Sequence, residues 1–135
     1  MTTMKQKKEL IKHDKNKNRM ELLPPDVLAA TAKIFTFGGI KYRAWDWANA
    51  GDWSRAYGAL QRHLNLWWAG EDLDKETRQS HLHHAMCELS FLVAWELRNS
   101  GNDDRYKLSK EVLDTMSDMT FIEHNEYLKK NKDKK

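Results

Sequence analysis

The chain has few of the residues that break or crosslink structure: 135 residues include two prolines, six glycines and one cysteine. A single cysteine excludes a disulfide scaffold, and so little proline and glycine excludes collagen-like and Pro/Gly-rich disordered chains. No basic pair stands beside Cys87 in the sequence, so we expect a buried thiol rather than a nucleophile. The remaining composition, 40% hydrophobic and 32% charged, fits one compact domain.

Long apolar runs are also missing. No run approaches the roughly 20 residues that a membrane span requires. The lysine-rich N-terminus has no apolar segment behind it, so it does not predict a signal peptide. We therefore expect a cytoplasmic protein, or one of the host cytoplasm if a phage encodes it.

The net charge of +3 is unevenly distributed along the chain. Residues 1–20 carry seven basic and two acidic residues, and residues 129–135 carry five basic residues and one acidic residue. The 11 basic and 17 acidic residues of 21–128 leave this part at −6. An acidic body between basic ends is not the pattern of a uniformly basic nucleic-acid binder.

Hydrophobic periodicity predicts an all-α fold like a four-helix bundle, with no strand-like alternation. We expect a basic mobile arm over 1–12, an all-α domain over 13–128 and a lysine-rich tail over 129–135. Four helices are indicated by their start and stop signals. They run from Pro25 to Gly38-Gly39, from a Ser54 cap to Gly70, from a Ser80 cap to Asn99-Ser100-Gly101, and from about Ser109 into the tail.

Tryptophan is abundant, with six residues. We expect Trp67, Trp68 and Trp95 in the core, and an ordered loop over 40–53 whose Tyr42, Trp45 and Trp47 either stack on a planar base or plug the core. Four short helices barely cover so many large side chains. The sequence therefore favours a homodimer or homotetramer.

Histidines and carboxylates form two stripes at helical spacing. His63 and Glu71 share a face of the second predicted helix, and His81, His84 and Glu88 share a face of the third. If the helices pack antiparallel, Glu71 lies near His81 and His63 lies near Glu88. The two stripes then face each other.

The turn between these helices holds Asp72, Asp74 and Glu76. Carboxylate oxygens beside imidazoles suit Mg²⁺ or Mn²⁺, which complete their shells with substrate phosphates. A solvated, helix-capping turn explains the same acids equally well. Zinc is a competing ion, but no H-E-x-x-H or C-x-x-C spacing is present, and no phosphate-binding glycine loop either. Side chains suited to gripping phosphate are Lys41, Arg55 and Arg62, with Lys17 and Arg19 in the arm.

These motifs resemble the phage-associated dATP/dGTP diphosphohydrolase family, which is related to the all-α MazG-type nucleoside triphosphate pyrophosphohydrolases. The resemblance covers roughly residues 13–98. It is carried by Leu22-Leu23-Pro24-Pro25, Phe35-Thr36-Phe37-Gly38, Lys41-Tyr42, Trp47, Trp53-Ser54-Arg55, Arg62-His63-Leu64, Gly70-Glu71-Asp72, Asp74, Glu76-Thr77 and His81-Leu82 with His84-Ala85.

The resemblance implies a metal-dependent enzyme that cleaves a purine deoxynucleoside triphosphate into monophosphate and pyrophosphate. It implies Mg²⁺ or Mn²⁺ as cofactor. The implied metal ligands are His63, Glu71, Asp72, Asp74, His81 and His84, and the implied substrate-side residues are Lys17, Arg19, Lys41, Tyr42, Trp47, Arg55 and Arg62. One of Glu71, Asp72 or Glu88 is expected to take the proton of the attacking water, and the sequence does not choose among them.

The chain departs from the family pattern at several positions. Asn16 replaces a usual glycine in the arm, Asp46 replaces a common asparagine, and Arg78-Gln79 fill a turn that often holds glycine. MazG relatives carry E-x-x-E and E-x-x-D motifs where histidines stand here. Two other functions therefore stay open: a non-catalytic protein that binds a nucleotide or host factor, and a nucleic-acid accessory that uses its basic ends.

Overall fold

The computed structural model describes residues 8–119 and 121–132, and for residues 121–125 it describes the backbone alone. Part of the expected arm (1–7) and of the expected tail (133–135) lies outside these residues. The described chain is all-helical, apart from isolated bridges. The elements are η1 (Met20–Leu22), α1 (Pro25–Lys41), η2 (Asp46–Asn49), α2 (Trp53–Trp68), α3 (His81–Arg98), α4 (Lys110–Asp118) and α5 (Phe121–Lys130).

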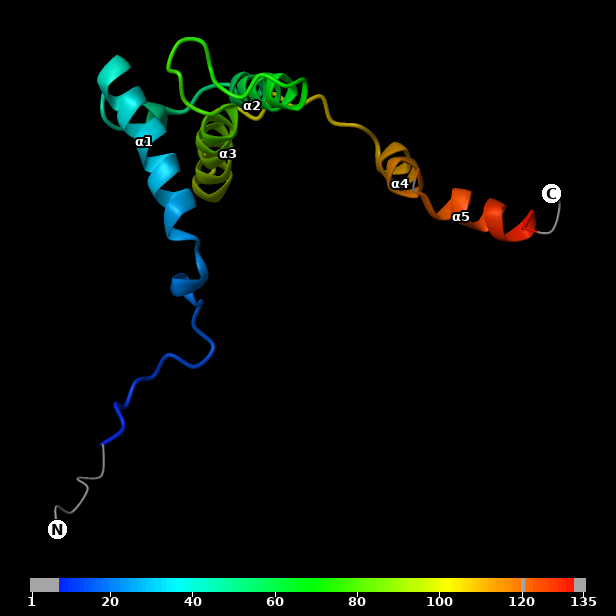
Figure 1. Ribbon diagram of the computed structural model, residues 1–135, viewed down its shortest axis with the longest axis horizontal. Coiled ribbons are helices and arrows are strands. Elements are labelled where there is room, and N and C mark those ends of the chain that lie inside the picture. Colours follow the sequence, from blue (N-terminus) through cyan, green and yellow to red (C-terminus); the bar gives the residue numbers. More distant parts are fainter. Residues whose placement is uncertain (1–7, 120, 133–135) are drawn as a thin grey trace.

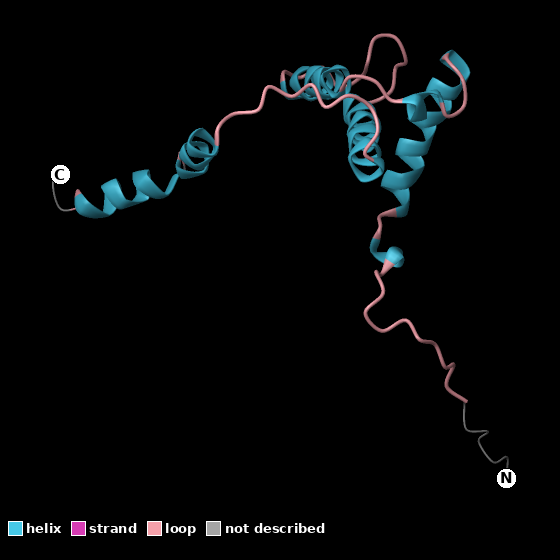
Figure 2. Cartoon of the chain, turned by 180° about the vertical axis from the view of Figure 1, so that it is seen from behind, coloured by secondary structure: helices cyan, strands magenta, loops and turns pink. Residues whose placement is uncertain are grey.

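Helix α3 is the centre of the fold because it packs against both α1 and α2, and η2 also contacts it. The arm and the α4–α5 segment extend away from this three-helix body on different sides (Figure 1). Figure 2 shows the same separation from behind. The expectation of four helices packed in one bundle therefore needs correction, since the described part of the chain packs only three together.

The segment after α3 explains why α4 lies apart. Asn102 exchanges backbone hydrogen bonds with the start of α2, donating to Gly51 (2.9 Å) and accepting from Trp53 (3.0 Å). Asp104 then accepts from the Ser54 amide (2.9 Å) and from its hydroxyl. These bonds hold residues 102–104 at the beginning of α2, and the chain leaves the body from that point (Figure 1).

The same contacts correct one predicted cap. α2 begins at Trp53, and Ser54 lies inside its first turn rather than before it. Asp104, 50 residues away, satisfies the Ser54 amide instead, because a carboxylate near a helix start accepts from free amides. The predicted cap Ser80 is confirmed by its bond from Leu82. Ser109, near which the fourth helix was expected to begin, caps α4 by accepting from Val112.

Helix α1 begins at Pro25 as predicted, but the expected stop at Gly38-Gly39 is wrong. The helix continues to Lys41, and the Tyr42 amide donates to the Gly38 carbonyl at 2.9 Å. A glycine costs only about 1 kcal/mol inside a helix. Local breaking signals of that size are easily overcome by packing on α3.

The buried apolar core is small. Within the described residues it comprises Ile34, Ala56, Leu60, Ala85, Cys87 and Trp95. Burial raises the pKa of Cys87 to about 12, as expected for a structural thiol. Trp95 is buried as predicted, but Trp67 and Trp68 are 37% and 83% exposed, because none of the described helices covers that side of α2. None of the described helices is long and apolar enough to cross a membrane.

The expected lysine-rich tail over 129–135 overlaps the end of helix α5. α5 includes Lys129 and Lys130 in its last turn. Basic side chains at a helix C-terminus interact favourably with the helix dipole, so the charge run and the helix are compatible.

Candidate active site

A cleft of about 1120 Å³ lies between the end of α1, the loop that holds η2, the inner faces of α2 and α3, and the turn 71–80. It collects nine of the residues singled out from the sequence: Lys41, Tyr42, Trp47, Arg55, Arg62, His63, Asp74, His84 and Glu88. Five others do not line it: Lys17, Arg19, Glu71, Asp72 and His81. Cationic, anionic and aromatic groups thus meet in one hollow.

His81 stands behind the cleft and is completely buried, with 0% exposure. Its Nε2 lies 3.0 Å from Glu71 Oε2, and its Nδ1 lies 2.9 Å from His63 Nδ1. A carboxylate only accepts, so Nε2–H of His81 donates to Glu71. In the neutral tautomer that this bond selects, His81 accepts from His63 and leaves His63 Nε2 as an acceptor.

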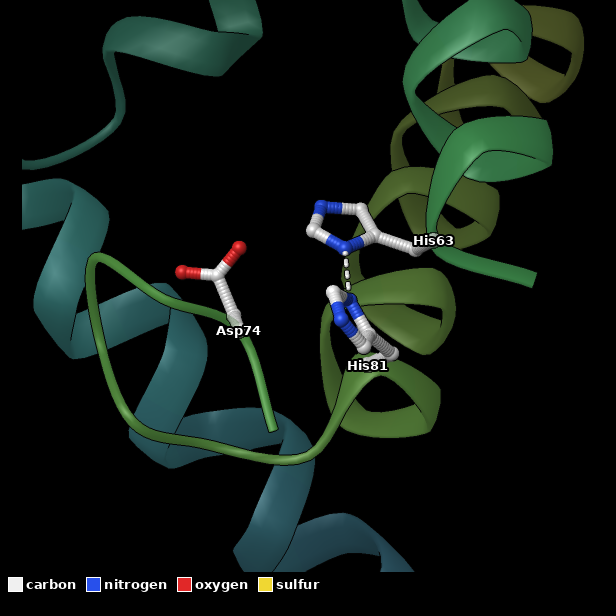
Figure 3. Close-up of side chains that lie close together, drawn as sticks. All are labelled: His63, Asp74 and His81. Carbon is white, nitrogen blue, oxygen red and sulfur yellow. Dashed lines mark hydrogen bonds between the residues drawn. The ribbon is translucent and has the colours of Figure 1, made fainter. Parts of the chain in front are cut away.

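The bond between Glu71 and His81 confirms that these two residues lie close together. Both ring nitrogens of His81 are thus bonded to protein partners. Figure 3 shows the two imidazoles, from α2 and α3, across from Asp74 on the turn. One ligand atom from each of His63, Asp74 and His81 lies within 4.8 Å of the others, so the group has the spacing of a cation site.

Thr77 links Asp74 to His84, a role that sequence reasoning missed. Asp74 Oδ1 accepts from the Thr77 amide (2.9 Å), the Thr77 hydroxyl (3.2 Å) and the Glu76 amide (3.0 Å). Since the hydroxyl donates to Asp74, it accepts from His84 Nε2 at 2.6 Å. An acid followed three residues later by threonine is the sequence signal of such a turn.

Burial lowers the pKa of His63 and of His84, whose rings stack at 4.7 Å with an 8° interplanar angle. The His84 charge lowers the pKa of His63 further. Both imidazoles are therefore mainly neutral at pH 7. Although burial raises the pKa of Asp74, bonds from Thr77 oppose it and the net pKa is lowered, so the carboxylate is ionised.

Glu88, on α3, is another acid that lines the cleft. Burial raises the pKa of Glu88 to about 7, and the nearby charge of Arg62 lowers it in part. Gly58 leaves space for Arg62, because a Cβ at position 58 would lie 3.1 Å from Arg62 Nη1. A carboxyl with a pKa close to 7 is suited to accept or release a proton at neutral pH.

Lys41 reaches across the mouth of the cleft to the turn. Its Nζ lies 2.6 Å from Glu76 Oε1, and this bond raises the pKa of Lys41. Both side chains are substantially exposed, so the ion pair contributes little to stability. Lys41 is therefore free to exchange Glu76 for another anion.

Aromatic side chains form the far wall. The Trp47 ring stacks on Phe91 (5.5 Å, 15°), meets Phe35 edge-on and lies under the Arg98 guanidinium (5.1 Å). Trp47 is thus held by protein neighbours, while Trp45 and Tyr42 are 70% and 64% exposed. The loop both closes the core and presents aromatic faces to the cleft.

Two departures from the glycine pattern have a structural explanation. Asn16 and Arg78 both have left-handed backbone conformations, with φ of 69° and 60°. Glycine adopts this region without strain, asparagine adopts it with little, and arginine adopts it least readily of the three. Both positions thus have a backbone conformation that glycine adopts without strain.

A family model described as "dATP/dGTP diphosphohydrolase, N-terminal" matches residues 7–105. The chain belongs to the dATP/dGTP diphosphohydrolase family. The matched region covers the three-helix body and ends just after Asp104, so α4 and α5 lie beyond it. No curated protein and no solved structure matches the chain.

The description of the family names dATP and dGTP, which are nucleoside triphosphates. The all-helical architecture is consistent with membership of this family.

Proposed function

We propose that this family member hydrolyses dATP and dGTP to the monophosphate and pyrophosphate in nucleotide metabolism, in a phage or bacterial setting. The supporting observation is the cleft, which joins four cationic side chains, five carboxylates and an aromatic wall. Its volume of about 1120 Å³ is at the upper end of small-molecule sites and accommodates a nucleoside triphosphate.

Each part of the cleft has a chemical role in this proposal. Lys41, Arg55 and Arg62 bind phosphate oxygens, since ammonium and guanidinium groups donate charge-assisted hydrogen bonds to them. Tyr42 and Trp45 are exposed for stacking on the purine. Trp47 supports them from the protein side.

The donor set also suits Mg²⁺ or Mn²⁺. Asp74, Glu76 and Glu88 line the cleft. All three hydrogen bonds that Asp74 accepts are made to its Oδ1, which leaves Oδ2 for a cation. Asp74 would hold the ion, with His63 beside it, because one ligand atom of each residue lies within 4.8 Å of the other. Glu71, Asp72, His81 and His84 were expected as ligands as well; Glu71, His81 and His84 are engaged in hydrogen bonds instead, and Asp72 is exposed outside the cleft. When bound, such an ion neutralises phosphate charge and lowers the pKa of a coordinated water.

Glu88 is the residue that we assign to proton transfer. Its carboxylate oxygen accepts the proton of the attacking water, because burial raises the pKa of Glu88 to about 7. His63 and His84 are mainly neutral at pH 7, because burial lowers the pKa of each, so they add no positive charge to the cleft.

The test is pyrophosphate release from a panel of deoxynucleoside and nucleoside triphosphates with Mg²⁺, Mn²⁺ or EDTA. We expect Glu88→Gln and Asp74→Asn to lower kcat at least about 100-fold, as expected when a general base or cation ligand is lost. Asp114→Asn, on the exposed face of α4, is the matched control and should retain wild-type rates.

Nucleotide affinity measured by calorimetry separates this proposal from a non-catalytic binding protein. Tight binding with no pyrophosphate from any nucleotide and metal would refute the hydrolase proposal. Binding that Asp74→Asn and Glu88→Gln leave unchanged would add support for the binding protein.

We also propose that the protein is a homo-oligomer. The small core and many exposed large apolar side chains support this, because a monomer rarely leaves so much contiguous apolar surface in water.

A further inference from the structure

The Thr77 hydroxyl uses its whole hydrogen-bonding capacity inside the protein. A hydroxyl donates one hydrogen bond and accepts two. This one donates to Asp74 Oδ1 (3.2 Å) and accepts from the Gln79 amide (3.2 Å) and from His84 Nε2 (2.6 Å). Asp74 and Gln79 belong to the turn, whereas His84 belongs to α3. Thr77 therefore ties the turn to a side chain of the central helix.

The backbone of the turn over residues 73–80 is closed on itself. The Asp74 amide donates to the Gln79 carbonyl, and the Arg78 amide donates to the Asp74 carbonyl, both at 2.8 Å. The two end residues of the turn pair in an antiparallel bridge. With the backbone held in this way, the direction of the Asp74 carboxylate depends on the hydrogen bonds that its oxygens accept.

These hydrogen bonds fix one oxygen of Asp74 and leave the other. Thr77 supplies two of the three donors to Oδ1, its amide and its hydroxyl, and the Glu76 amide supplies the third. The hydroxyl is the one side-chain donor of the three. Figure 3 shows the carboxylate across from His63, the other residue to which we assign the cation.

The same hydroxyl acts on His63 through His84. Because it accepts from His84 Nε2, that nitrogen carries the proton, and the neutral ring is unprotonated at Nδ1. The bond fixes the His84 ring, which stacks on the His63 ring at 4.7 Å with an interplanar angle of 8°. His63 is also bonded to His81 through Nδ1. His63 is thus held by a stacked ring and by a hydrogen bond, and its Nε2 stays an acceptor.

We propose that Thr77 is the positioning residue of this site: its hydroxyl holds Asp74 directly and His63 through the stacked His84, so that both present ligand atoms to one divalent cation. This inference rests on the cation site of the proposed function and adds a residue that does not itself contact the ion. Residues that orient metal ligands typically change metal affinity by about 10- to 100-fold when they are replaced.

The first test is the Mn²⁺ affinity of the nucleotide-free full chain, with free Mn²⁺ measured by electron paramagnetic resonance. Thr77→Val keeps the shape of the side chain but removes the hydroxyl, and it should weaken binding about 10- to 100-fold. Thr77→Ser keeps the hydroxyl and should bind with nearly wild-type affinity. Asp74→Asn identifies the site, because the Mn²⁺ binding that this variant loses is binding at Asp74.

Thr115→Val is the matched control for removal of a hydroxyl. The Thr115 hydroxyl donates to the Glu111 carbonyl at 2.9 Å on the exposed surface of α4. Its loss should leave the Mn²⁺ affinity unchanged. Circular dichroism must show equal helicity in all the variants compared.

The second test reads the protonated nitrogens of the imidazoles by ¹⁵N nuclear magnetic resonance near pH 7, without metal. In the wild type we expect His84 to be protonated at Nε2, and His63 to be protonated at Nδ1 and unprotonated at Nε2. Thr77→Val should convert His84 to a mixture of both tautomers, whereas Thr115→Val should not. The wild-type spectrum tests the proposal even if Thr77→Val fails to fold.

Each contrary result overturns the proposal in its own way. Equal Mn²⁺ affinity of Thr77→Val and the wild type shows that the hydroxyl does not position the ligands. Thr77→Ser binding as weakly as Thr77→Val assigns the effect to the lost methyl group. A wild-type His84 protonated at Nδ1 shows that the hydroxyl donates to His84 and not to Asp74. Absence of any Mn²⁺ binding that Asp74→Asn removes shows that there is no site to position.

The hydrolase proposal fails separately. If Thr77→Val loses Mn²⁺ affinity but the wild type releases no pyrophosphate from any nucleotide, Thr77 positions the ligands of a cation site without hydrolysis. If the wild type releases pyrophosphate and Thr77→Val keeps the Mn²⁺ affinity, hydrolysis stands and the positioning role is refuted.

Discussion

Burial shifts the pKa values of three residues that line the cleft in opposite directions. The pKa of His63 and His84 is lowered by burial, whereas the pKa of Glu88 is raised. Burial thus disfavours the charged form of each group. The two histidines are mainly neutral at pH 7, whereas Glu88, with a pKa of about 7, is about half ionised and can still accept a proton.

Glu88 makes a testable contribution to stability. Its folded pKa of about 7 exceeds the ordinary value of 4.5, so the folded state binds more protons between these values and stability falls as pH rises through that window. Glu88→Gln removes this effect. We expect the variant to equal the wild type near pH 4.5 and to exceed it by about 1–2 kcal/mol at pH 8, after allowance for solvent screening of a partly buried group.

Urea unfolding at both pH values, with EDTA present, measures this difference. Glu96→Gln, exposed on the same helix, is the control and should change stability little at either pH. An advantage of Glu88→Gln that is the same at pH 4.5 and pH 8 would contradict the electrostatic explanation.

At the scale of elements, the contact between the segment that follows α3 and the start of α2 depends on Gly101. Gly101 has φ of +78°, and a Cβ there would lie 2.7 Å from the Gly51 carbonyl oxygen and 3.1 Å from Trp53 Nε1. The close approach permits the Asn102 bonds that hold this segment on α2. A side chain at position 101 must push the two backbones apart.

Gly101→Ala should therefore destabilise the protein by about 2 kcal/mol or more, from a strained backbone together with a displaced contact. Gly38→Ala is the matched control: position 38 lies inside α1 with open space around it, so alanine should stabilise by about 0.5–1 kcal/mol. Thermal unfolding monitored by circular dichroism gives both values. Equal effects of the two substitutions would show that the approach at Gly101 is not required.

The whole molecule consists of a three-helix body with extended segments at both ends (Figure 1). Tyr106 is 92% exposed, and residues 104–110 are exposed throughout. Lys107 and Lys110 provide trypsin sites there. Limited trypsin digestion should first cut before residue 20 and between residues 105 and 110, because exposed extended chain enters a protease most readily.

Mass spectrometry of the first fragments identifies the cuts. Lys33 and Arg62 lie in packed helices and should be cut only after the body unfolds. Early cleavage at these positions would indicate that the three helices do not form one stable unit.

Several features were predictable from the sequence because they depend on local chemistry. Pro25 starts α1, while Ser80 and Ser109 cap their helices, since each acts on atoms a few residues away. Glu71 lies beside His81 as expected. The expected position of Glu71 on a helical stripe with His63 is wrong, because α2 ends at Trp68 and Glu71 lies in the turn that follows. The family resemblance itself was confirmed by the match over residues 7–105.

Other features depended on contacts between distant segments, and the sequence could not reveal them. Ser54 is bonded by Asp104 from 50 residues away, and α1 passes through Gly38-Gly39. Thr77 became a link in the site only when His84 was brought beside it. Trp68 stays exposed because none of the helices in the described part of the chain covers it.

The sequence by itself determined the helical class, the family and the kinds of groups that surround the cleft, because periodicity and residue chemistry are local properties. Tertiary structure alone decided which of those groups share one hollow, which histidine nitrogens are already bonded, and which hydroxyl joins the turn to α3. Burial and hydrogen-bond partners are properties of packed helices, and they exist only when segments far apart in the chain meet.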